Sequence, residues 1–310
     1  MGTDKISEKR NLKLYQLSRL KEGFATSFDG TKIHFQSVGQ GSPPIVCCNG
    51  LSVSTFFWVY LEKHFEQFQQ VVTWDYRGHG QSSLNEHTKN YSIQALVKDL
   101  EAVLEALKIK KAIFAGHSMG SQVMFEFYRR HPKRVAGMIS CFGYPGHPMD
   151  SFFNLRFSPL IFRLVYFLGT QFPKQATAIS RFFLANPLSF WAGGLLKVMN
   201  TGMIERKYAE QYIEHVLSRD PLLFPTLLKS SQENSADDIL KKIKVPTLIL
   251  GGELDQFTPA WISKKMHRLI PNSEILMIHK ATHAALVEQP ELVNLRIEKF
   301  LLEKKLLRKR

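Results

Sequence analysis

Ser118, in the glycine-flanked segment 116–120 (GHSMG), is the residue of this sequence best placed to act as a nucleophile. The apolar residues 112–115 before it predict a buried strand, and apolar residues at helical spacing after it predict a helix over 122–130. A strand that turns directly into a helix bends sharply, and glycines remove the side chains that would collide there. Ser118 would stand at the tip of the turn, beside the positive end of the helix. The pattern predicts a nucleophile elbow.

A serine hydroxyl is a poor nucleophile, so a base must take its proton and an acid must orient that base. Among the 11 histidines, His283 is expected in a loop just after the last predicted strand, 274–278. That loop lies at the carboxyl edge of the sheet, where ligands and catalytic groups gather in open α/β sheets. His279 is the rival, but we expect it still to belong to the strand, where a histidine is usually structural. We therefore favour His283 as the base.

The acid should come from a loop at the same edge. Asp255 follows the predicted strand 245–250 through a short glycine-containing loop. Glu253 and Asp150 are alternatives, and a purely structural interpretation makes Asp255 an N-terminal charge of the next helix. The chain order Ser118, Asp255, His283 is the order found with this type of elbow. We expect Asp255 to be the acid.

The segments around these residues alternate between strand and helix patterns. A hairpin is expected over 24–38, with its turn at Asp29-Gly30. Ser92 should cap a long helix. The order predicts an α/β protein with a mostly parallel central sheet covered by helices on both faces. The remaining strands are expected at 45–48, 71–75 and 135–142, besides those above, and the helices at 55–68, 93–107, 259–269 and from residue 284.

One segment, residues 146–237, breaks this alternation. It has apolar helical runs punctuated by prolines, and nine of the 23 phenylalanines fall between Phe152 and Phe190. We interpret it as an inserted helical cap, or lid, on a core made of 22–145 and 238–310, with 1–21 as a basic N-terminal leader. Most cap aromatics should form the cap's own core, and some should line an apolar acyl or aryl pocket above Ser118. A membrane span is not expected, because the most apolar run, 152–168, contains two arginines and a proline.

Together these motifs resemble the α/β-hydrolase family, in its group of lipase- and esterase-like enzymes with a helical lid. The matching pieces lie between residues 24 and 300: Asn49-Gly50, the run 75–82 (DYRGHGQS), the elbow, 252–255 (GELD) and 283–290 (HAALVEQP). The resemblance implies catalytic roles for Ser118, Asp255 and His283. The serine at the elbow argues against the dehalogenase and epoxide hydrolase relatives, which use aspartate there.

Acyl transfer develops a negative oxygen, which fixed N–H groups must stabilise in an oxyanion hole. One donor should be the backbone N–H of Met119, directly after the nucleophile at the helix N-terminus. The family resemblance supplies the other, the backbone N–H of Leu51. The chain departs from the family where Asn49 replaces the usual histidine and Thr282 replaces a common glycine.

Three further features have structural interpretations. The run Arg77-Gly78-His79-Gly80 is expected to be loop architecture, with His79 not catalytic. Trp58 should pack the first helix onto the sheet. Cys47, Cys48 and Cys141 lie in apolar strand patterns without metal-ligand spacing, which predicts buried free thiols. No metal or organic cofactor is implied.

Charge and composition narrow the partners. Hydrophobic and charged contents of 44% and 22% are ordinary for a globular protein, whereas the net charge of +14 favours anionic surfaces. No nucleic-acid motif accompanies this charge, so no nucleic-acid partner is expected. The basic C-terminal run 304–310 is either a solvated helix end or a contact with an anionic membrane surface. Residues 1–23 lack the apolar core of a signal peptide, and we expect a cytoplasmic protein.

These observations predict a serine hydrolase for carboxylic esters with hydrophobic acyl or aromatic groups. The same triad could serve C–C bond hydrolysis, amide or peptide cleavage, acyl transfer or perhydrolysis. A ligand-binding receptor or scaffold on the same fold is the non-enzymatic alternative.

Overall fold

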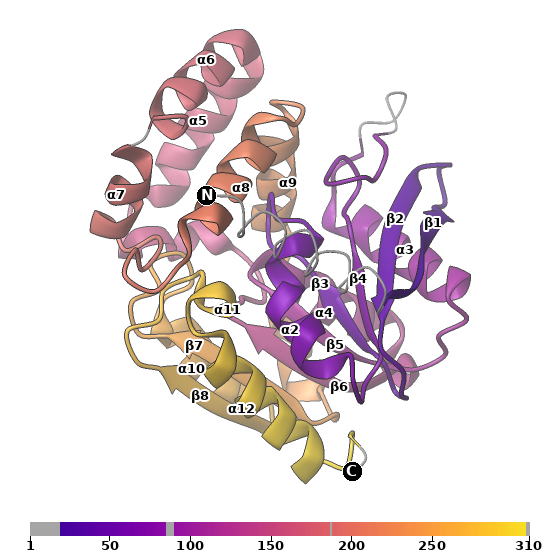
Figure 1. Ribbon diagram of the computed structural model, residues 1–310. Helices are drawn as coiled ribbons and strands as arrows, with labels where there is room; N and C mark the ends of the chain where they lie inside the picture. Colours follow the sequence, from indigo (N-terminus) through magenta and orange to yellow (C-terminus); the bar gives the residue numbers. More distant parts are fainter. Residues whose placement is uncertain (1–18, 85–89, 187, 308–310) are drawn as a thin grey trace, which may run out of the picture.

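A computed structural model describes residues 19–84, 90–186 and 188–307, and an eight-stranded sheet forms its centre (Figure 1). The spatial order is β1-β2-β4-β3-β5-β6-β7-β8. β1 and β2 pair antiparallel, β2 joins β4 antiparallel, and the pairs from β4 to β8 are parallel. The predicted mostly parallel α/β sheet is confirmed. The strands are β1 (Arg19–Thr26), β2 (Lys32–Val38), β3 (Ile45–Cys48), β4 (Val71–Trp74), β5 (Ala112–His117), β6 (Val135–Cys141), β7 (Thr247–Gly252) and β8 (Ser273–Ile278).

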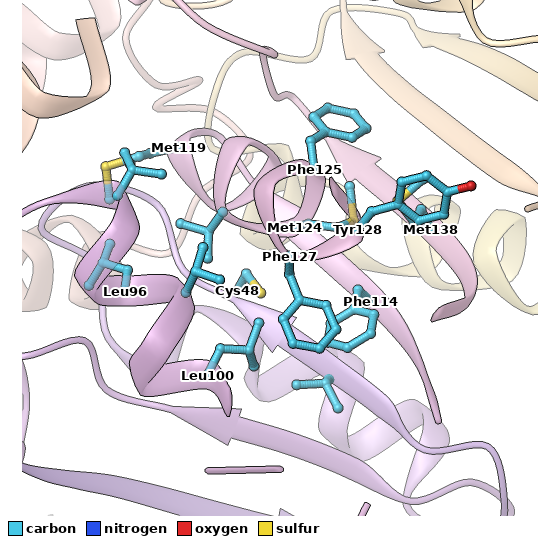
Figure 2. Packing of buried hydrophobic residues seen from close by; sticks show 14 of the residues in the cluster. Cys48, Leu96, Leu100, Phe114, Met119, Met124, Phe125, Phe127, Tyr128 and Met138 are labelled. Atoms are coloured by element: carbon cyan, nitrogen blue, oxygen red, sulfur yellow. The ribbon is translucent and has the colours of Figure 1, made fainter. Parts of the chain in front are cut away.

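Helices cover both faces of the sheet because the central strands are apolar on both sides. In β5, Phe114 faces one buried cluster and Ile113 the other, as expected for side chains that alternate along a strand. α3 (Ile93–Ala106), α4 (Met119–Arg130) and α10 (Ala260–Leu269) pack on the first face. The second face is covered by η1 (Thr55–Trp58), α2 (Val59–Phe65), α11 (Ala285–Glu288) and α12 (Pro290–Glu303). Figure 2 shows α3 and α4 closing over Cys48 and Phe114.

Several local predictions are confirmed. The hairpin turns at Asp29-Gly30, with Thr26 paired to Lys32. The Ser92 hydroxyl accepts a hydrogen bond from the Ala95 N–H at 3.2 Å and so caps α3. Trp58 is buried in the second cluster.

The cysteines behave as expected. Cys47 and Cys48 point to opposite faces of β3, and together with Cys141 they are free and buried.

Other boundaries differ from the predictions. The helix after the elbow begins at Met119, three residues early, and the terminal helix is broken into α11 and α12. The break falls before Pro290, whose ring cannot continue the preceding helix. Residues 1–18 of the predicted leader lie outside the described residues, whereas Arg19–Lys21 belong to β1.

Within the described residues, the chain between β6 and β7 forms helices and one isolated bridge, between Gly146 and Ser235. α9 packs against α3, and α5 lies against α6. In Figure 1, α5, α6 and α7 lie at one end of the molecule, beyond the sheet. The helices of this segment are η3 (Pro148–Asp150), η4 (Phe152–Asn154), α5 (Ser158–Gln171), α6 (Pro173–Leu184), α7 (Leu188–Leu195), α8 (Arg206–Leu217), α9 (Leu223–Glu233) and η5 (Asp237–Lys242).

The prediction that most aromatics of residues 146–237 form a cap core is wrong. Of the nine phenylalanines from Phe152 to Phe190, only Phe190 is buried, and Phe152, Phe153 and Phe162 are half-buried. The other five are exposed, because α5 and α6 each pack through one side only and present the remaining apolar side to solvent.

Candidate active site

Ser118 occupies the turn between β5 and α4 in a backbone conformation that residues other than glycine rarely adopt, with φ 53° and ψ −120°. Such a conformation costs roughly 1–3 kcal/mol and persists only where the surroundings enforce it. The turn is enforced by close packing: a Cβ on Gly116 would lie 2.6 Å from the backbone of Gly120, and one on Gly120 would overlap the carbonyl of Cys48. The structure therefore has the sharp, glycine-dependent bend that the sequence predicts around Ser118.

His283 and Asp255 meet at the carboxyl edge of the sheet. The His283 Nδ1 lies 2.9 Å from Asp255 Oδ2, and the Asp255 carboxylate is fully buried. The other carboxylate oxygen, Oδ1, accepts hydrogen bonds from the backbone N–H groups of Phe257 and Thr258, both at 2.8 Å. The Thr258 hydroxyl donates to Oδ2 at 2.6 Å. This network fixes the carboxylate and directs it at the imidazole.

The rival residues do not join this pair. His279 lies just past β8 instead of inside it, and its side chain is 76% exposed. Its Nδ1 contacts Glu253 at 2.7 Å, so the rival base and a rival acid pair with each other. Asp150 accepts a hydrogen bond from the Gln232 amide at 2.9 Å. Of the weighed residues, Asp255 and His283 are the ones that the structure brings together.

His117, which the sequence argument passed over, connects the elbow to the His283 loop. Its Nε2 donates to the His283 carbonyl at 3.0 Å, and the two rings lie 4.9 Å apart. Burial, with a contribution from His283, lowers the pKa of His117 to about 3, so its ring stays neutral. Because His117 directly precedes Ser118, this hydrogen bond holds the loop that carries His283 close to the elbow. The sequence signal that could have pointed to His117 is its position next to Ser118.

Among the described residues, no hydrogen bond joins the Ser118 hydroxyl to the His283 imidazole. The Ser118 hydroxyl makes no hydrogen bond within the described part of the chain, and Nδ1 of His283 is engaged with Asp255, which leaves Nε2 for a reacting group. Catalytic hydrogen bonds are often long before the substrate complex forms and tighten within it.

Two backbone N–H groups near Ser118 are available to an anion. Neither the Leu51 nor the Met119 N–H finds an acceptor among the described residues. Met119 opens α4, where the helix dipole adds positive potential. The preceding loop approaches closely, since a Cβ on Gly50 would lie 3.4 Å from the Ser118 Cβ. This arrangement can stabilise a developing oxyanion.

Asn49, where the family usually has histidine, anchors that loop through both ends of its amide. Nδ2 donates to the Trp74 carbonyl at 2.7 Å, and Oδ1 accepts from the Trp58 Nε1 at 2.8 Å. Asn49 is fully buried. The amide therefore ties the loop both to the end of β4 and to η1, and this departure from the family pattern has a structural reason.

Thr282, the second departure, anchors the loop that carries His283. Its hydroxyl donates to Glu288 Oε1 at 2.5 Å, and its backbone N–H donates to Oε2 at 3.1 Å. Burial raises the pKa of Glu288 despite these hydrogen bonds. A glycine could supply only the backbone contact.

The run from Arg77 to Gly80 is loop architecture. Arg77 is buried and forms ion pairs with Asp99 at 2.7 Å and Asp29 at 2.9 Å. Burial alone would raise the pKa of Asp29, but hydrogen bonds from Thr31 and Arg77 lower it to about 2. His79 contacts the Arg77 carbonyl through Nδ1, and burial lowers its pKa to about 4. These contacts hold the loop together, as predicted.

Aromatic rings border the imidazole. Phe257 lies 5.1 Å from the His283 ring and stacks on Phe152, with 4.9 Å between centroids and an interplanar angle of 7°. On the elbow side, Phe57 lies 4.8 Å from His117. Apolar substrate groups would find aromatic partners here.

The sequence also matches a known protein family. The sequence model of the alpha/beta hydrolase fold matches residues 43–290. The chain belongs to the α/β-hydrolase fold family. This confirms the family and fold that the motifs predict.

Several relatives of this α/β-hydrolase are named hydrolases. The chain is 24% identical over 278 residues to an uncharacterized hydrolase of Bacillus subtilis, covering 88% of this chain and 95% of that one. It is 25% identical to bifunctional epoxide hydrolase 2 of Sus scrofa, covering 89% of this chain but 54% of that longer protein. A thermophilic esterase from Thermogutta terrifontis shares the fold, with a TM-score of 0.75, 23% identity and coverage of 92% and 99%. These likenesses support a hydrolase without deciding which bond it cleaves.

Neither a metal-binding cluster nor a membrane-spanning helix occurs in the described residues. No group of three or more histidine, cysteine, aspartate or glutamate side chains in residues 19–84, 90–186 and 188–307 is arranged to hold a metal ion. In the same ranges, no helix has the length and apolarity needed to cross a bilayer.

Proposed function

We propose that this α/β-hydrolase cleaves carboxylic esters through an acyl-enzyme on Ser118. The observation that carries the proposal is the strained Ser118 turn together with the hydrogen-bonded pair of His283 and the buried Asp255, and two acceptor-free backbone N–H groups. His283 takes the serine proton as the hydroxyl attacks the carbonyl, and Asp255 orients the imidazolium. Leu51 and Met119 N–H groups hold the oxyanion. The leaving alcohol takes the proton from His283, and water then releases the acid by the same steps.

The substrate class follows from the surroundings of the imidazole. Phe57 lies against His117 and Phe257 against His283, with Phe152 stacked on Phe257, and these apolar rings favour small esters with hydrophobic acyl or aromatic groups. The chemistry requires no metal or organic cofactor.

An epoxide substrate is the alternative that several relatives' names suggest. Serine is unsuited to it, because an alkoxide that opens an epoxide forms an ether. An ether has no carbonyl for water to attack, so the enzyme would stay alkylated. An aspartate nucleophile forms an ester instead, which water can hydrolyse. The serine at position 118 therefore favours carboxylic esters.

Labelling and turnover test the proposal together. A fluorophosphonate probe should label the wild-type chain and fail to label Ser118→Ala, while Ser121→Ala, three residues on, should still be labelled. A chain-length series of p-nitrophenyl esters should show turnover that rises with apolar acyl groups.

Two outcomes would contradict the proposal. Labelling without turnover of any ester would favour C–C bond hydrolysis, amide cleavage, acyl transfer or perhydrolysis by the same residues. Absence of both would favour a ligand-binding receptor on this fold.

A further inference from the structure

An unusually apolar exposed surface lies on helices α5, α6 and α7. Of the 23 large apolar side chains exposed in the described residues, 15 lie between positions 157 and 196, and we call these 15 side chains the cap face. Monomeric soluble proteins rarely leave so many together in water, and such surfaces mark interaction sites. The cap face consists of Phe157, Leu160, Ile161, Leu164, Val165, Phe167, Leu168, Phe172, Ile179, Phe182, Phe183, Leu188, Trp191, Leu195 and Leu196.

Each helix presents its apolar residues on one side. In α5, the exposed positions 160, 161, 164, 165 and 168 recur at three- and four-residue intervals, which places them on a single face. Phe162 and Tyr166, on the other side, are half-buried. α6 shows the same pattern at Ile179, Phe182 and Phe183. These are amphipathic helices with the apolar side turned outward.

The charges of this region all have one sign. Residues 151–204 contain five basic residues and no aspartate or glutamate, although 27 acidic residues occur in the 310-residue chain. An average stretch of that length would hold about five acidic residues. All five cations are exposed, and none forms an ion pair with a carboxylate in the described chain. They are Arg156, Arg163, Lys174, Arg181 and Lys197.

We propose that the cap face docks on an anionic lipid bilayer, with α5, α6 and α7 lying in the interface. α5 has 14 residues, whereas a helix needs about 20 to cross the hydrocarbon core. Amphipathic helices with aromatic and leucine side chains on one side and cations beside them bind the headgroup boundary. The apolar side chains would enter the acyl region, while the arginines and lysines contact phosphate groups.

A second copy of this chain is a poorer occupant. Two cap faces brought together would place five unpaired cations of one copy against five of the other, with no carboxylate from residues 151–204 between them. Like charges brought together without partners oppose association. An anionic bilayer supplies the missing negative charge.

Trp191 provides a direct probe of docking. It lies on α7 with 64% of its surface exposed, whereas Trp261, on α10 beside the sheet, is 49% exposed. In vesicles of phosphatidylcholine with about 30% brominated phosphatidylglycerol, the bromine atoms should quench Trp191 fluorescence, since interfacial helices bury their apolar side roughly 5–10 Å deep. Trp191→Phe should remove the quenching, and the matched change Trp261→Phe should leave it.

A second measurement tests the apolar and the charged contributions separately. We expect the triple variant Leu164→Ser/Phe182→Ser/Phe183→Ser to lower vesicle partitioning about tenfold or more. Leu292→Ser/Leu295→Ser, on exposed positions of α12, should have no effect.

For the charges, Arg163→Gln/Arg181→Gln should weaken binding to anionic vesicles several-fold. Lys110→Gln/Lys111→Gln, directly before β5 at the opposite edge of the sheet, should not. Equal partitioning into vesicles of phosphatidylcholine alone would overturn the anionic preference.

Other outcomes overturn the proposal altogether. The proposal fails if brominated lipid does not quench Trp191 fluorescence. It also fails if the wild type is a dimer in solution that the triple serine variant converts to monomers. Because vesicle binding is measured without substrate, the result does not depend on the proposed esterase activity, and Ser118→Ala should bind vesicles as the wild type does.

Discussion

Replacing Asp255 by asparagine tests the acid sharply, because the structure dictates how the new amide must sit. Oδ1 of Asp255 accepts from the backbone N–H groups of Phe257 and Thr258, both at 2.8 Å. Only the oxygen of an amide can satisfy two N–H donors. The amide nitrogen must therefore take the place of Oδ2, where His283 Nδ1 lies 2.9 Å away.

The magnitude follows from the tautomer that this amide imposes. An N–H at the Oδ2 position donates to His283 Nδ1, which leaves the imidazole proton on Nε2. That nitrogen then cannot accept the proton of Ser118. The same change in a serine protease triad lowers kcat by about 10⁴, which corresponds to about 5 kcal/mol of barrier. Because asparagine has nearly the size of aspartate, KM should change little.

The assay is steady-state hydrolysis of the best p-nitrophenyl ester, with the free energy of unfolding measured in urea for each variant. Glu253→Gln is the matched control, since it makes the same chemical change in the same loop on a residue that pairs with His279. It should retain full kcat. The assignment would be refuted by an Asp255→Asn variant within about tenfold of wild type. An equal loss in Glu253→Gln would refute it as well.

Four further predictions concern stability and the chain end. Asn49→Ala should lower the free energy of unfolding in urea by roughly 2–5 kcal/mol, because two buried groups lose their partners. Gly120→Ala should lower the free energy of unfolding by more than about 3 kcal/mol, since its Cβ would collide with backbone atoms. Gly30→Ala, whose Cβ would lie in open space, should cost about 1 kcal/mol. Equal losses of stability in the two variants would contradict the packing argument. The pKa of Asp29 is lowered from 3.8 to about 2, so its carboxylate stabilises the fold above about pH 4, and this contribution disappears as the pH falls toward 2. The free energy of unfolding of Asp29→Asn in urea should therefore depend less on pH in that range than that of the wild type. We also propose that the basic C-terminus contacts anionic membrane independently of the cap face. Deleting 308–310 from the Leu164→Ser/Phe182→Ser/Phe183→Ser variant should therefore reduce its remaining sedimentation with anionic vesicles at low salt, and an unchanged sedimentation would remove the idea.

The last of these changes is chosen to spare the packed part of the tail. Lys304 pairs with Glu274 at 2.6 Å, and Leu306 and Leu307 pack against the second core cluster. Removing 304–310 would therefore disturb the core as well as the charge. In Figure 1, α12 ends at the opposite end of the molecule from α5, α6 and α7, so one flat membrane would not reach both.

Local sequence determined the elbow and the layers of this protein. A glycine on each side of Ser118, a small apolar strand before it and a helical pattern after it leave one way to turn, because any larger side chain collides with backbone. Alternating strand and helix patterns likewise lead to a mostly parallel sheet, since short connections and apolar strands permit little else.

Tertiary structure decided which distant side chains meet and which apolar residues are covered. The two histidines weighed as the base and two of the candidate acids lie only a few positions apart in sequence. The ends of β7 and β8 determine that Asp255 and His283 pair at the site, whereas Glu253 and His279 pair in solvent. The sequence equally could not reveal that α5 and α6 turn their apolar sides outward. Helical periodicity identifies an apolar face, but what covers that face depends on contacts between segments far apart in the chain.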